Sequence, residues 1–528
     1  MNRSELKNEI ERAWPGVQCR PDAASGASEV ACERAVLVDV CRRLFHEWGF
    51  GFAGLIVEEG AEAWLLRYVF YGERDAGRVC VLVSGPLAEQ VFPSIAVKAR
   101  IPAADWHERE AEDLFGVRFE GHPRLGDFVL HDDAWQEGVE PMRRGFDPEA
   151  ALRNRLPHPD WRPRRIVQEA GAFVMPVGPK FSGVAESVHF ELETVGEDVI
   201  RSWTRLFYKW RAVEKLAEGK TIDDALLLAE RFAATTAFAH GLAFCQAVET
   251  VAGAEIPARA RILRVFLAEL ERLRQHAGAI REICESTALA VANSQAAMLE
   301  EELLRVSGEL SGHRYLFGLL APGGLLADLP TQACRTAQRE ASAAVARLDE
   351  LERRLTISSS FLDRIEEVGI IRPHTARSYS LVGPVARASA FARDLRRAQP
   401  YSGYDEFEFE VPSEEEGDGY ARLRVLFAEA RQSVRIMEQA ARALGEGGDV
   451  RAPVTPCAGA ALGWAEAPRG ATFHWVRLDQ AGRIGRYRVM TPSFANWHSF
   501  HLAAEKFAFQ DFPIILSTFD LSVAENDR

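Results

Sequence analysis

A proline- and arginine-rich stretch at residues 153–166 divides this sequence of 528 residues into two parts of different character. The stretch contains three prolines and five arginines and has no apolar period, which is typical of a linker. A chain of this length also exceeds what one ordinary hydrophobic core supports. We therefore expect a domain over residues 1–150, a linker over 151–174 and a second, larger domain over 175–528.

The first part of the chain alternates short β-rich runs with turns. Residues 64–71 and 78–83 are rich in β-branched and aromatic side chains and flank a turn at 72–77, which predicts a β-hairpin. Helical patterns occur at about 4–13 and 30–47. Together these features predict a small, compact α/β domain at the N-terminal end.

The second part is dominated by helix-forming sequence, above all between about 195 and 355. After Pro257, apolar residues recur at three- and four-residue steps through 263–280 and make one apolar stripe along a helix. Successive long helices predict a helical bundle, and strands are expected near 472–478 and 485–490. The expected fold class is therefore α+β: a small N-terminal α/β domain followed by a larger, mainly helical domain with peripheral strands.

Composition argues against several classes of function. The net charge of −14 disfavours nucleic-acid binding, because a phosphate backbone is bound mainly through lysine and arginine. The longest apolar stretch, residues 233–248, is interrupted by His240 and falls short of the roughly 20 apolar residues that cross a bilayer, so we expect no transmembrane segment. The N-terminus lacks the apolar core of a secretory signal, which predicts a cytoplasmic location. The eight cysteines form no CxxC pair and are expected to be buried thiols.

Residues 105–144 carry a specific set of motifs. They contain the pattern W-x-E-R-E-x-x-D-L-F-G at 106–116, an E-G-H-P turn at 120–123 and P-x-R-R at 141–144. This segment is similar to the short C-type subunit of NADH:quinone oxidoreductase, or complex I. The residues themselves predict an acidic helix that ends at Gly116, because glycine readily adopts the left-handed conformation of a helix C-cap. The carboxylates of this helix are expected to form a solvated face: Glu108, Glu110, Glu112 and Asp113.

Six further motifs run through the second part of the chain. They are MPVGP (175–179), RLFYKWRAVEKLAEGKT (205–221), LVGPVARASAFARD (381–394), GWAEAPRG (463–470), SFANW (493–497) and DFPII (511–515). Residues 174–528 thereby resemble the large subunit of energy-converting nickel–iron hydrogenases of the formate hydrogenlyase type, and more distantly the D-type subunit of complex I. A C-like part followed by a D-like part in one chain is itself the arrangement of the formate hydrogenlyase large subunit.

The resemblance implies a subunit of a membrane-associated oxidoreductase complex. Iron–sulfur clusters would belong to a small partner subunit, and antiporter-like membrane subunits would complete the complex. This chain would bind no cofactor itself and would lie at the inner face of the cell membrane as a peripheral subunit. The sequence has no nucleotide-binding glycine motif, so any NADH would bind another subunit.

The nickel–iron ligands of such hydrogenases are absent from this sequence. The resemblance places two cysteine pairs in RxCGxC and DPCxxC motifs, because the metals need soft, anionic thiolate ligands. Here the four cysteine positions are occupied by Ala233, Thr236, Ser522 and Glu525. We predict that the nickel–iron site is lost and that no metal is bound. A weak magnesium or manganese set of Thr236, Ser522, Glu525 and His240 is the remaining alternative.

The quinone ligands that the complex I likeness implies are replaced as well. Phe181 holds the place of a histidine in the glycine-proline loop, and Phe232 is the aromatic residue nearest to the position of a tyrosine. Neither side chain can donate a hydrogen bond to a quinone carbonyl. Electron transfer to a quinone or another acceptor at the former cavity is therefore an open alternative without support from these two positions.

Several polar residues around the site are retained. Glu186 matches the loop acid that, in the hydrogenases, passes protons outward; a solvated loop carboxylate is the equal alternative. Arg469 matches the arginine that lies over the metal centre, and without a metal it can pin Asp520 through a bidentate pair. We predict a buried group of Arg231, Asp520 and Arg469. The candidate catalytic residues are Glu186, Arg469 and Asp520.

Three functions remain open from the sequence. The first is a scaffold subunit with an electron- or proton-coupling role and no hydrogen chemistry of its own. The second is an electron-transferring subunit of the NADH:quinone oxidoreductase type. The third, a free-standing protein outside any complex, has little support from the sequence, and independent catalysis is not expected.

Overall fold

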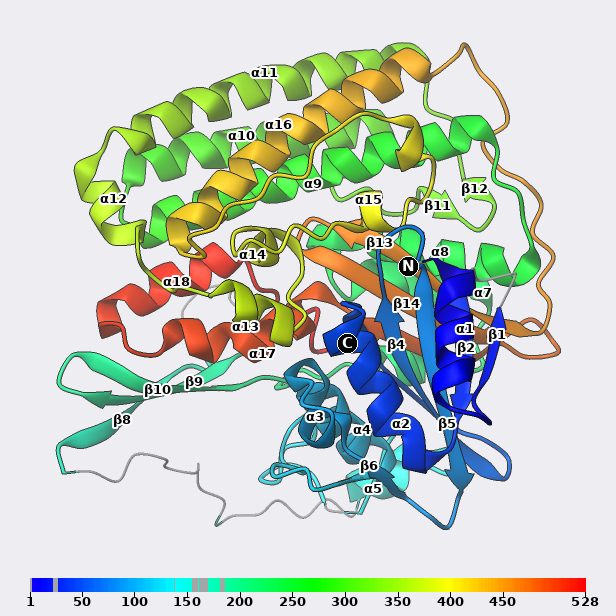
Figure 1. Ribbon diagram of the computed structural model, residues 1–528. Coiled ribbons are helices and arrows are strands. Elements are labelled where there is room, and N and C mark those ends of the chain that lie inside the picture. Colours follow the sequence, from blue (N-terminus) through cyan, green and yellow to red (C-terminus); the bar gives the residue numbers. More distant parts are fainter. Residues whose placement is uncertain (1, 22–26, 137, 154–159, 161–169, 181–185) are drawn as a thin grey trace.

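The computed structural model describes residues 2–21, 27–136, 138–153, 160, 170–180 and 186–528. Most of the predicted linker lies outside the described residues, and so does Phe181. The described chain combines helices and sheets, so the predicted α+β class is confirmed (Figure 1). In the described part, no helix combines the length and the apolar character needed to cross a membrane.

The N-terminal domain is built on a five-stranded sheet with the strand order β1-β2-β5-β4-β3. The strands are β1 (Gln18–Pro21), β2 (Ala27–Cys32), β3 (Gly51–Glu59), β4 (Ala63–Tyr71) and β5 (Arg78–Pro86). Strands β4 and β5 pair antiparallel from Tyr71 opposite Arg78 onward, which confirms the predicted hairpin. The parallel pair β2–β5 was not predicted from the sequence.

Short helices and a further strand pair complete this domain. They are α1 (Arg3–Ala13), α2 (Arg34–Arg42), η1 (Arg43–Glu47), β6 (Val91–Pro93), α3 (Ile95–Lys98), η2 (Pro102–Ala104), α4 (Asp105–Phe115), β7 (Arg118–Glu120) and α5 (Pro148–Arg153). Helix α1 begins with a capping box of Asn2 and Glu5, and α4 ends at Gly116 with a positive φ of 73°, as predicted.

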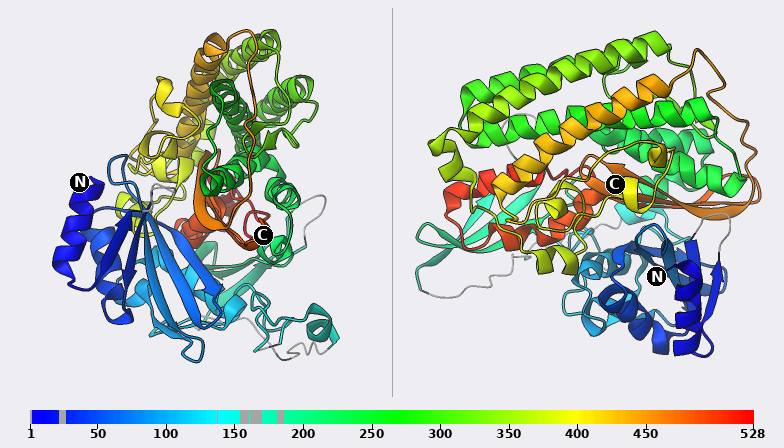
Figure 2. Two further views of the ribbon diagram at one scale, coloured as in Figure 1. Left: turned by 90° about the vertical axis from the view of Figure 1, so that its right-hand side faces the viewer. Right: turned by 45° about the horizontal axis from the view of Figure 1, so that its top comes forward.

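Both faces of the N-terminal sheet are covered, because alternate strand residues point to opposite sides. Ile56, Val69 and Tyr71 pack into an apolar core shared with the second domain, whereas Val57 and Phe70 pack into the core beneath the domain's own helices. Figure 2 shows the blue sheet beside the orange strands of the second domain. The two domains therefore bury apolar surface against each other.

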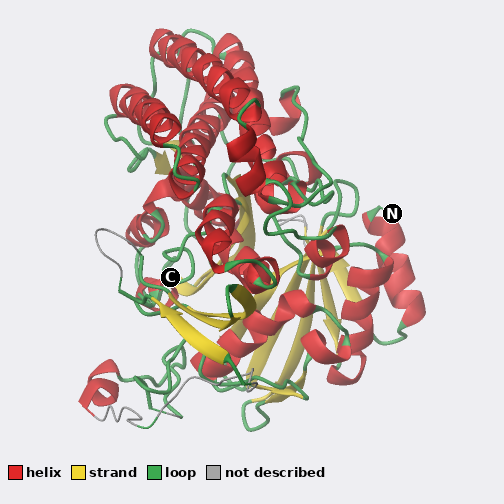
Figure 3. Ribbon diagram, turned by 90° about the vertical axis from the view of Figure 1, so that its left-hand side faces the viewer, coloured by secondary structure: helices red, strands yellow, loops and turns green. Residues whose placement is uncertain are grey.

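In the described part of the second domain, five long helices form the bulk, and the four longest lie together at one end of the molecule (Figure 1 and Figure 3). The five helices are α8 (Ala237–Ala252), α9 (Ala258–Ser286), α10 (Ala290–Ser311), α11 (Thr331–Thr356) and α16 (Gly419–Ala443). The predicted apolar stripe lies on α9. This helix is buried on its other faces as well, including Arg264, Glu269 and Arg272, because α10, α16 and the C-terminal sheet surround it.

Two three-stranded antiparallel sheets accompany these helices. One consists of β8 (Ala172–Val177), β9 (His189–Val195) and β10 (Asp198–Arg205); the other of β13 (Gly459–Ala467), β14 (Gly470–Leu478) and β15 (Ile484–Met490). The predictions of β14 and β15 are confirmed. Helix α8 lies directly on β13: a Cβ atom at Gly463 would be 1.9 Å from the carbonyl oxygen of Ala243, so this approach requires glycine.

The remaining elements connect these layers. They are α6 (Val213–Ala217), α7 (Ile222–Arg231), η3 (Ala234–Thr236), β11 (Leu320–Ala321), β12 (Gly324–Leu325), α12 (Ser359–Ile365), α13 (Pro373–Ser378), α14 (Gly383–Arg387), α15 (Leu395–Ala398), η4 (Tyr404–Glu406), α17 (Pro492–Ala504), η5 (Phe509–Asp511) and α18 (Phe512–Phe519).

The prediction of a solvated acidic face on α4 is wrong. Glu108 is fully buried and accepts hydrogen bonds from the hydroxyl of Ser94 at 2.5 Å and the amide of Ile95 at 2.7 Å. Burial raises the pKa of Glu108 to about 8. Asp113 accepts bonds from three successive amides, at residues 128–130. The reason is tertiary: α4 lies between the N-terminal sheet and the second domain, where its carboxylates satisfy backbone amides and arginines.

Candidate functional site

The four positions that correspond to the lost cysteines come together in space. The Thr236 hydroxyl donates to Glu525 Oε1 at 3.1 Å and also lies 3.4 Å from the carbonyl oxygen of Ala233. The amide of Glu525 donates to Ser522 Oγ at 3.3 Å. All four residues are buried. The segment before α8 and the segment after α18 therefore meet as the resemblance implies, and their side chains contact one another.

Glu525 is the charged centre of this group. Its Oε1 lies 3.6 Å from Arg469 Nη1 and 3.7 Å from His240 Nε2, and its Oε2 accepts from the amide of Ser493 at 3.1 Å. Burial alone raises the pKa of Glu525, but the neighbouring His240 and the charge of Arg469 outweigh it and lower the pKa to about 2. Glu525 is therefore an ionised carboxylate at neutral pH.

Replacing Glu525 by glutamine is expected to lower the free energy of unfolding at pH 7 by about 3 kcal/mol, because a pKa lowered by two to three units corresponds to that much interaction. A lowered folded-state pKa contributes stability above the ordinary carboxyl pKa and loses it as the pH falls toward 2. The difference from wild type should therefore shrink between pH 4.5 and pH 3 in urea unfolding experiments. A pH-independent difference would contradict the argument, and Glu438→Gln on an exposed helix face serves as the control.

Arg469 pairs with Asp520 as predicted, but only one of its two hydrogen bonds reaches the carboxylate. Arg469 donates from Nε to the carbonyl oxygen of Asp520 at 2.6 Å and from Nη2 to Asp520 Oδ1 at 3.1 Å. Its Nη1 donates to the hydroxyl of Thr235 at 3.0 Å. Gln275 of α9 was not predicted, yet its amide nitrogen lies 3.0 Å from both carboxylate oxygens of Asp520. No local sequence pattern could identify Gln275 as a site residue, because it and Asp520 are 245 residues apart in the sequence.

The prediction for Arg231 is wrong. This residue ends α7, its side chain is 47% exposed, and it lies over the ring of Phe317 and 3.6 Å from Glu230. Successive helix residues point about 100° apart, so the buried Glu230 turns inward and Arg231 turns outward. Arg274 of α9, not Arg231, donates to the carbonyl oxygen of Thr235 beside the pair of Arg469 and its carboxylate.

Glu186 contacts the segment that carries the C-terminal part of the site. Its carboxylate accepts from the amides of Val523 at 2.6 Å and Ala524 at 3.0 Å, although the residue as a whole is exposed. Glu186 therefore stabilises the turn that follows Ser522. It is exposed, as a solvated loop carboxylate would be, and it also contacts the site, as a proton-passing acid would. A role in proton transfer stays a prediction. Phe181, on the same loop, lies outside the described residues.

A chain of buried side chains runs from Glu525 into the C-terminal sheet. His240 Nδ1 lies 3.1 Å from His474 Nε2, and His474 Nδ1 lies 2.8 Å from the Tyr487 hydroxyl. Burial holds the pKa of His474 well below its usual range and raises that of Tyr487, so both stay neutral. Tyr487 then donates to His474, His474 donates to His240, and the remaining proton of His240 faces Glu525. Sequence reasoning missed His474 and Tyr487.

The arrangement opposes a metal cation. Among the residues that the structure describes, no three His, Cys, Asp or Glu side chains are grouped so that they could hold a metal. The guanidinium of Arg469 already neutralises Glu525, and Thr236 donates its proton to the same carboxylate. The weak oxygen set of Thr236, Ser522, Glu525 and His240 therefore finds no support in the geometry.

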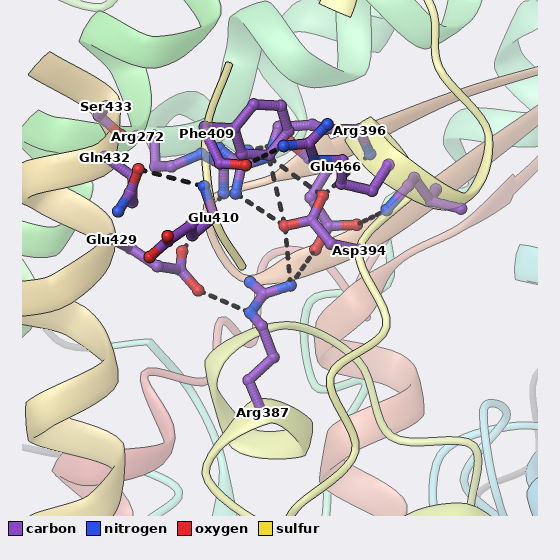
Figure 4. Close-up of polar contacts among 12 residues, drawn as sticks. Arg272, Arg387, Asp394, Arg396, Phe409, Glu410, Glu429, Gln432, Ser433 and Glu466 are labelled. Atoms are coloured by element: carbon purple, nitrogen blue, oxygen red, sulfur yellow. Dashed lines mark hydrogen bonds and ion pairs between the residues drawn. The ribbon is translucent and has the colours of Figure 1, made fainter. Parts of the chain in front are cut away.

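A buried cluster of charged side chains lies beside the site, and sequence reasoning did not anticipate it (Figure 4). It comprises Arg272, Arg387, Arg396, Glu269, Asp394, Glu429, Glu466 and His276, from α9, α14, α15, α16, β13 and the loop before α15. Its three guanidinium groups face four carboxyl groups. Burial and the neighbouring Asp394 raise the pKa of Glu466 to about 7, so this carboxyl can relieve the excess negative charge by binding a proton near neutral pH.

Comparison with known families agrees with this architecture. The family model described as "Respiratory-chain NADH dehydrogenase, 30 Kd subunit" matches residues 30–151. The model described as "Respiratory-chain NADH dehydrogenase, 49 Kd subunit" matches residues 293–456 and 450–528. The two matches follow one another in the order expected from the motifs.

Individual relatives show the same fusion. Formate hydrogenlyase subunit 5 of Escherichia coli (strain K12) is 30% identical over 479 residues, which cover 90% of this chain and 81% of that protein. The fused C/D chain of the NADH-quinone oxidoreductase of Bdellovibrio bacteriovorus is 28% identical, with 87% of each chain covered. Hydrogenase-4 component G of Escherichia coli (strain K12) is 30% identical, with 83% of this chain and 76% of that protein covered. The chain therefore belongs to the family of hydrogenase-type and complex I-type large subunits in which a 30-kDa-like domain is fused to a 49-kDa-like domain.

Proposed function

We propose that this chain is the large subunit of a membrane-associated oxidoreductase complex, that it lacks a nickel–iron site and that it does not itself evolve hydrogen. The observation that carries the proposal is the group of Ala233, Thr236, Ser522 and Glu525, in which no thiolate is present and the single carboxylate is held by Arg469. Nickel in such sites needs soft anionic sulfur ligands, which these side chains do not supply.

The proposed role is that of a scaffold with an electron- or proton-coupling function. Glu186 at the loop and the chain from His240 through His474 to Tyr487 support proton coupling, because the exposed Glu186 contacts the turn after Ser522 and the buried chain leads from Glu525 into the C-terminal sheet. The expected partners are a small iron–sulfur subunit, which would carry the clusters, and antiporter-like membrane subunits. Two relatives are named as subunits, of a formate hydrogenlyase and of an NADH-quinone oxidoreductase, which supports membership of a multi-subunit oxidoreductase. A peripheral position at the inner face of the cell membrane is part of the same proposal.

One observation favours the alternative, electron transfer to a quinone or another acceptor at the former cavity. Among the described residues, no acceptor lies within hydrogen-bond distance of His240 Nε2, and Glu525 Oε1 lies 3.7 Å from it. This nitrogen therefore offers a donor to an acceptor carbonyl at the site. The position of Phe232 counts against this alternative, because the centre of its ring lies 4.5 Å from that of His240 and occupies space beside that histidine.

The test is purification of the assembled complex through a tag on this chain, followed by elemental analysis and hydrogen-dependent dye reduction. We expect nickel far below one atom per complex and no dye reduction by hydrogen. The formate hydrogenlyase complex, purified in the same way, is the positive control. Stoichiometric nickel together with hydrogen turnover would overturn the proposal. Hydrogen-independent reduction of a short-chain quinone, abolished in His240→Phe, would establish the alternative instead.

A further inference from the structure

A cavity of about 290 Å³ opens at the junction of the two domains, away from the site described above. Helix α4 and residues 124–128 of the N-terminal domain form one wall, and β10 and α17 of the second domain form the other. Its polar lining contains histidine, serine and threonine side chains together with four arginines against two carboxylates: Arg109, Arg124, Arg201, Arg205, Asp127 and Glu505. A cavity that both domains build is present only in the folded full chain.

Arg109 of α4 is the unusual member of this lining. Its guanidinium lies 4.3 Å from the ring centre of Phe128 and donates only to the carbonyl oxygens of Gly126 at 3.4 Å and Asp127 at 3.3 Å. In the part of the chain that the structure describes, no carboxylate lies within ion-pairing distance of it, and its Nε has no acceptor. Desolvation lowers the pKa of Arg109, although the more distant carboxylates of Asp105, Asp113 and Asp127 act in the opposite direction. A desolvated guanidinium without a direct ion-pair partner is costly, so an anion in contact with it would be stabilising.

The opposite wall presents two more unpartnered groups. Ser202 and Thr204 are two residues apart on β10 and thus lie on the same face of the strand. Both hydroxyls are buried and make no hydrogen bond to any residue that the structure describes. Two further arginines at the rim, Arg124 and Arg201, are about half exposed and are already paired with Asp105 and Glu505. The cavity therefore offers donors in excess at its buried end.

We propose that this cavity binds a small oxyanion of the phosphate class. Phosphate oxygens accept from guanidinium Nε–H and from hydroxyl groups at once, which matches the three unpartnered groups. Water would satisfy the two hydroxyls but would leave Arg109 without an anion in direct contact with it. Free inorganic phosphate and the phosphate of a lipid headgroup offer the same chemistry, and a titration combined with vesicle binding separates these sources.

The test is isothermal titration of the full chain, in phosphate-free buffer of constant ionic strength, with inorganic phosphate. We expect saturable binding with one site. Arg109→Gln should weaken it by about tenfold or more, because a hydrogen bond to a charged group is lost. The double variant Ser202→Ala and Thr204→Val should weaken binding as well; because both hydroxyls are unpartnered, it decides the matter if Arg109→Gln does not fold. Arg442→Gln, on an exposed helix face, should bind as wild type does.

Flotation with vesicles of phosphatidic acid, compared with phosphatidylcholine, identifies the source. Binding to phosphatidic acid that is lost in Arg109→Gln, without binding of inorganic phosphate, would support a lipid headgroup as the ligand. The proposal would be overturned if binding were unchanged in both cavity variants. It would also be overturned if neither the phosphate titration nor the vesicle flotation showed binding that depends on Arg109; the cavity would then be a water-filled space.

Discussion

Replacing Arg387 by methionine is expected to lower the free energy of unfolding at pH 7 by about 3–5 kcal/mol. Arg387 Nε donates to Glu429 Oε1 at 2.6 Å, and Nη1 donates to Glu466 Oε1 at 2.8 Å and lies 3.3 Å from Asp394 Oδ2. Methionine fills much of the same volume, but it leaves the four carboxyl groups of the cluster with two guanidinium groups, those of Arg272 and Arg396, in place of three. This is the largest single loss that the structure predicts.

The pH dependence of this variant tests the cause. In the variant, the buried carboxyl groups that Arg387 contacts in the wild type should have folded-state pKa values above the ordinary carboxyl value. They should therefore bind protons more readily in the folded state than in the unfolded chain. Stability of the variant should then fall as the pH rises through that window, and the deficit relative to wild type should be smaller at pH 5 than at pH 8. Urea unfolding followed by circular dichroism across this range measures both quantities.

The matched control for Arg387→Met is Arg442→Met. Arg442 forms an ion pair with Glu438 on the exposed face of α16, where solvent screens the interaction. Its removal should leave the unfolding free energy unchanged within error. If Arg387→Met cost less than about 1 kcal/mol at pH 8, the ionic cluster would not be the element that stabilises this region.

Replacing Glu110 by glutamine is expected to have the second largest effect, a loss of about 3 kcal/mol at pH 7. Glu110 belongs to α4 of the N-terminal domain and accepts hydrogen bonds from Arg488 of β15 and, at 3.0 Å, from Arg528. Burial raises the pKa of Glu110, but the charges of Arg488 and Arg528 outweigh it and lower the pKa below the usual value. Glutamine keeps the shape and removes the charge that these two arginines face across the domain junction.

The measurement for Glu110→Gln should separate the two domains. Because the interaction joins them, urea unfolding of the variant is expected to lose cooperativity, with one part of the transition moving to lower urea concentration. Glu120→Gln removes an exposed carboxylate that pairs with Lys98 and should leave the transition unchanged. A variant of Glu110 that unfolds in one unshifted transition would show that its ion pairs contribute little to the junction of the domains.

Local sequence patterns predicted the elements whose cause is local. The hairpin of β4 and β5 follows from alternating β-branched residues around a turn, and the end of α4 follows from Gly116. The apolar stripe of α9 follows from residue spacing. The same patterns did not identify β13. They also gave the wrong environment for Glu110, because the local sequence around a helix carboxylate does not show whether the carboxylate faces water or an arginine.

Two elements of the site show where sequence reasoning ends. The pairing of Arg469 with Asp520 was predictable, because each stands in a recognisable motif and opposite charges in a closed site have few other partners. The position given to Arg231 was wrong, because the choice between inward and outward depends on the rotation of α7 against its neighbours. Gln275 and His474 belong to no motif, and only contacts across more than 200 residues bring them to the site.

The sequence by itself determined the order of the two domains, the secondary structure with strong periodicity and the four positions at which thiolates are replaced. Tertiary structure alone decided what surrounds those positions: the ionised Glu525 held by Arg469, the aligned histidines and the ionic cluster around α9. It also decided that Arg109, at the domain junction, has no ion-pair partner among the described residues. The physical reason is that periodicity and motifs encode which face of an element is apolar, whereas charge compensation depends on which distant side chains arrive within a few ångströms.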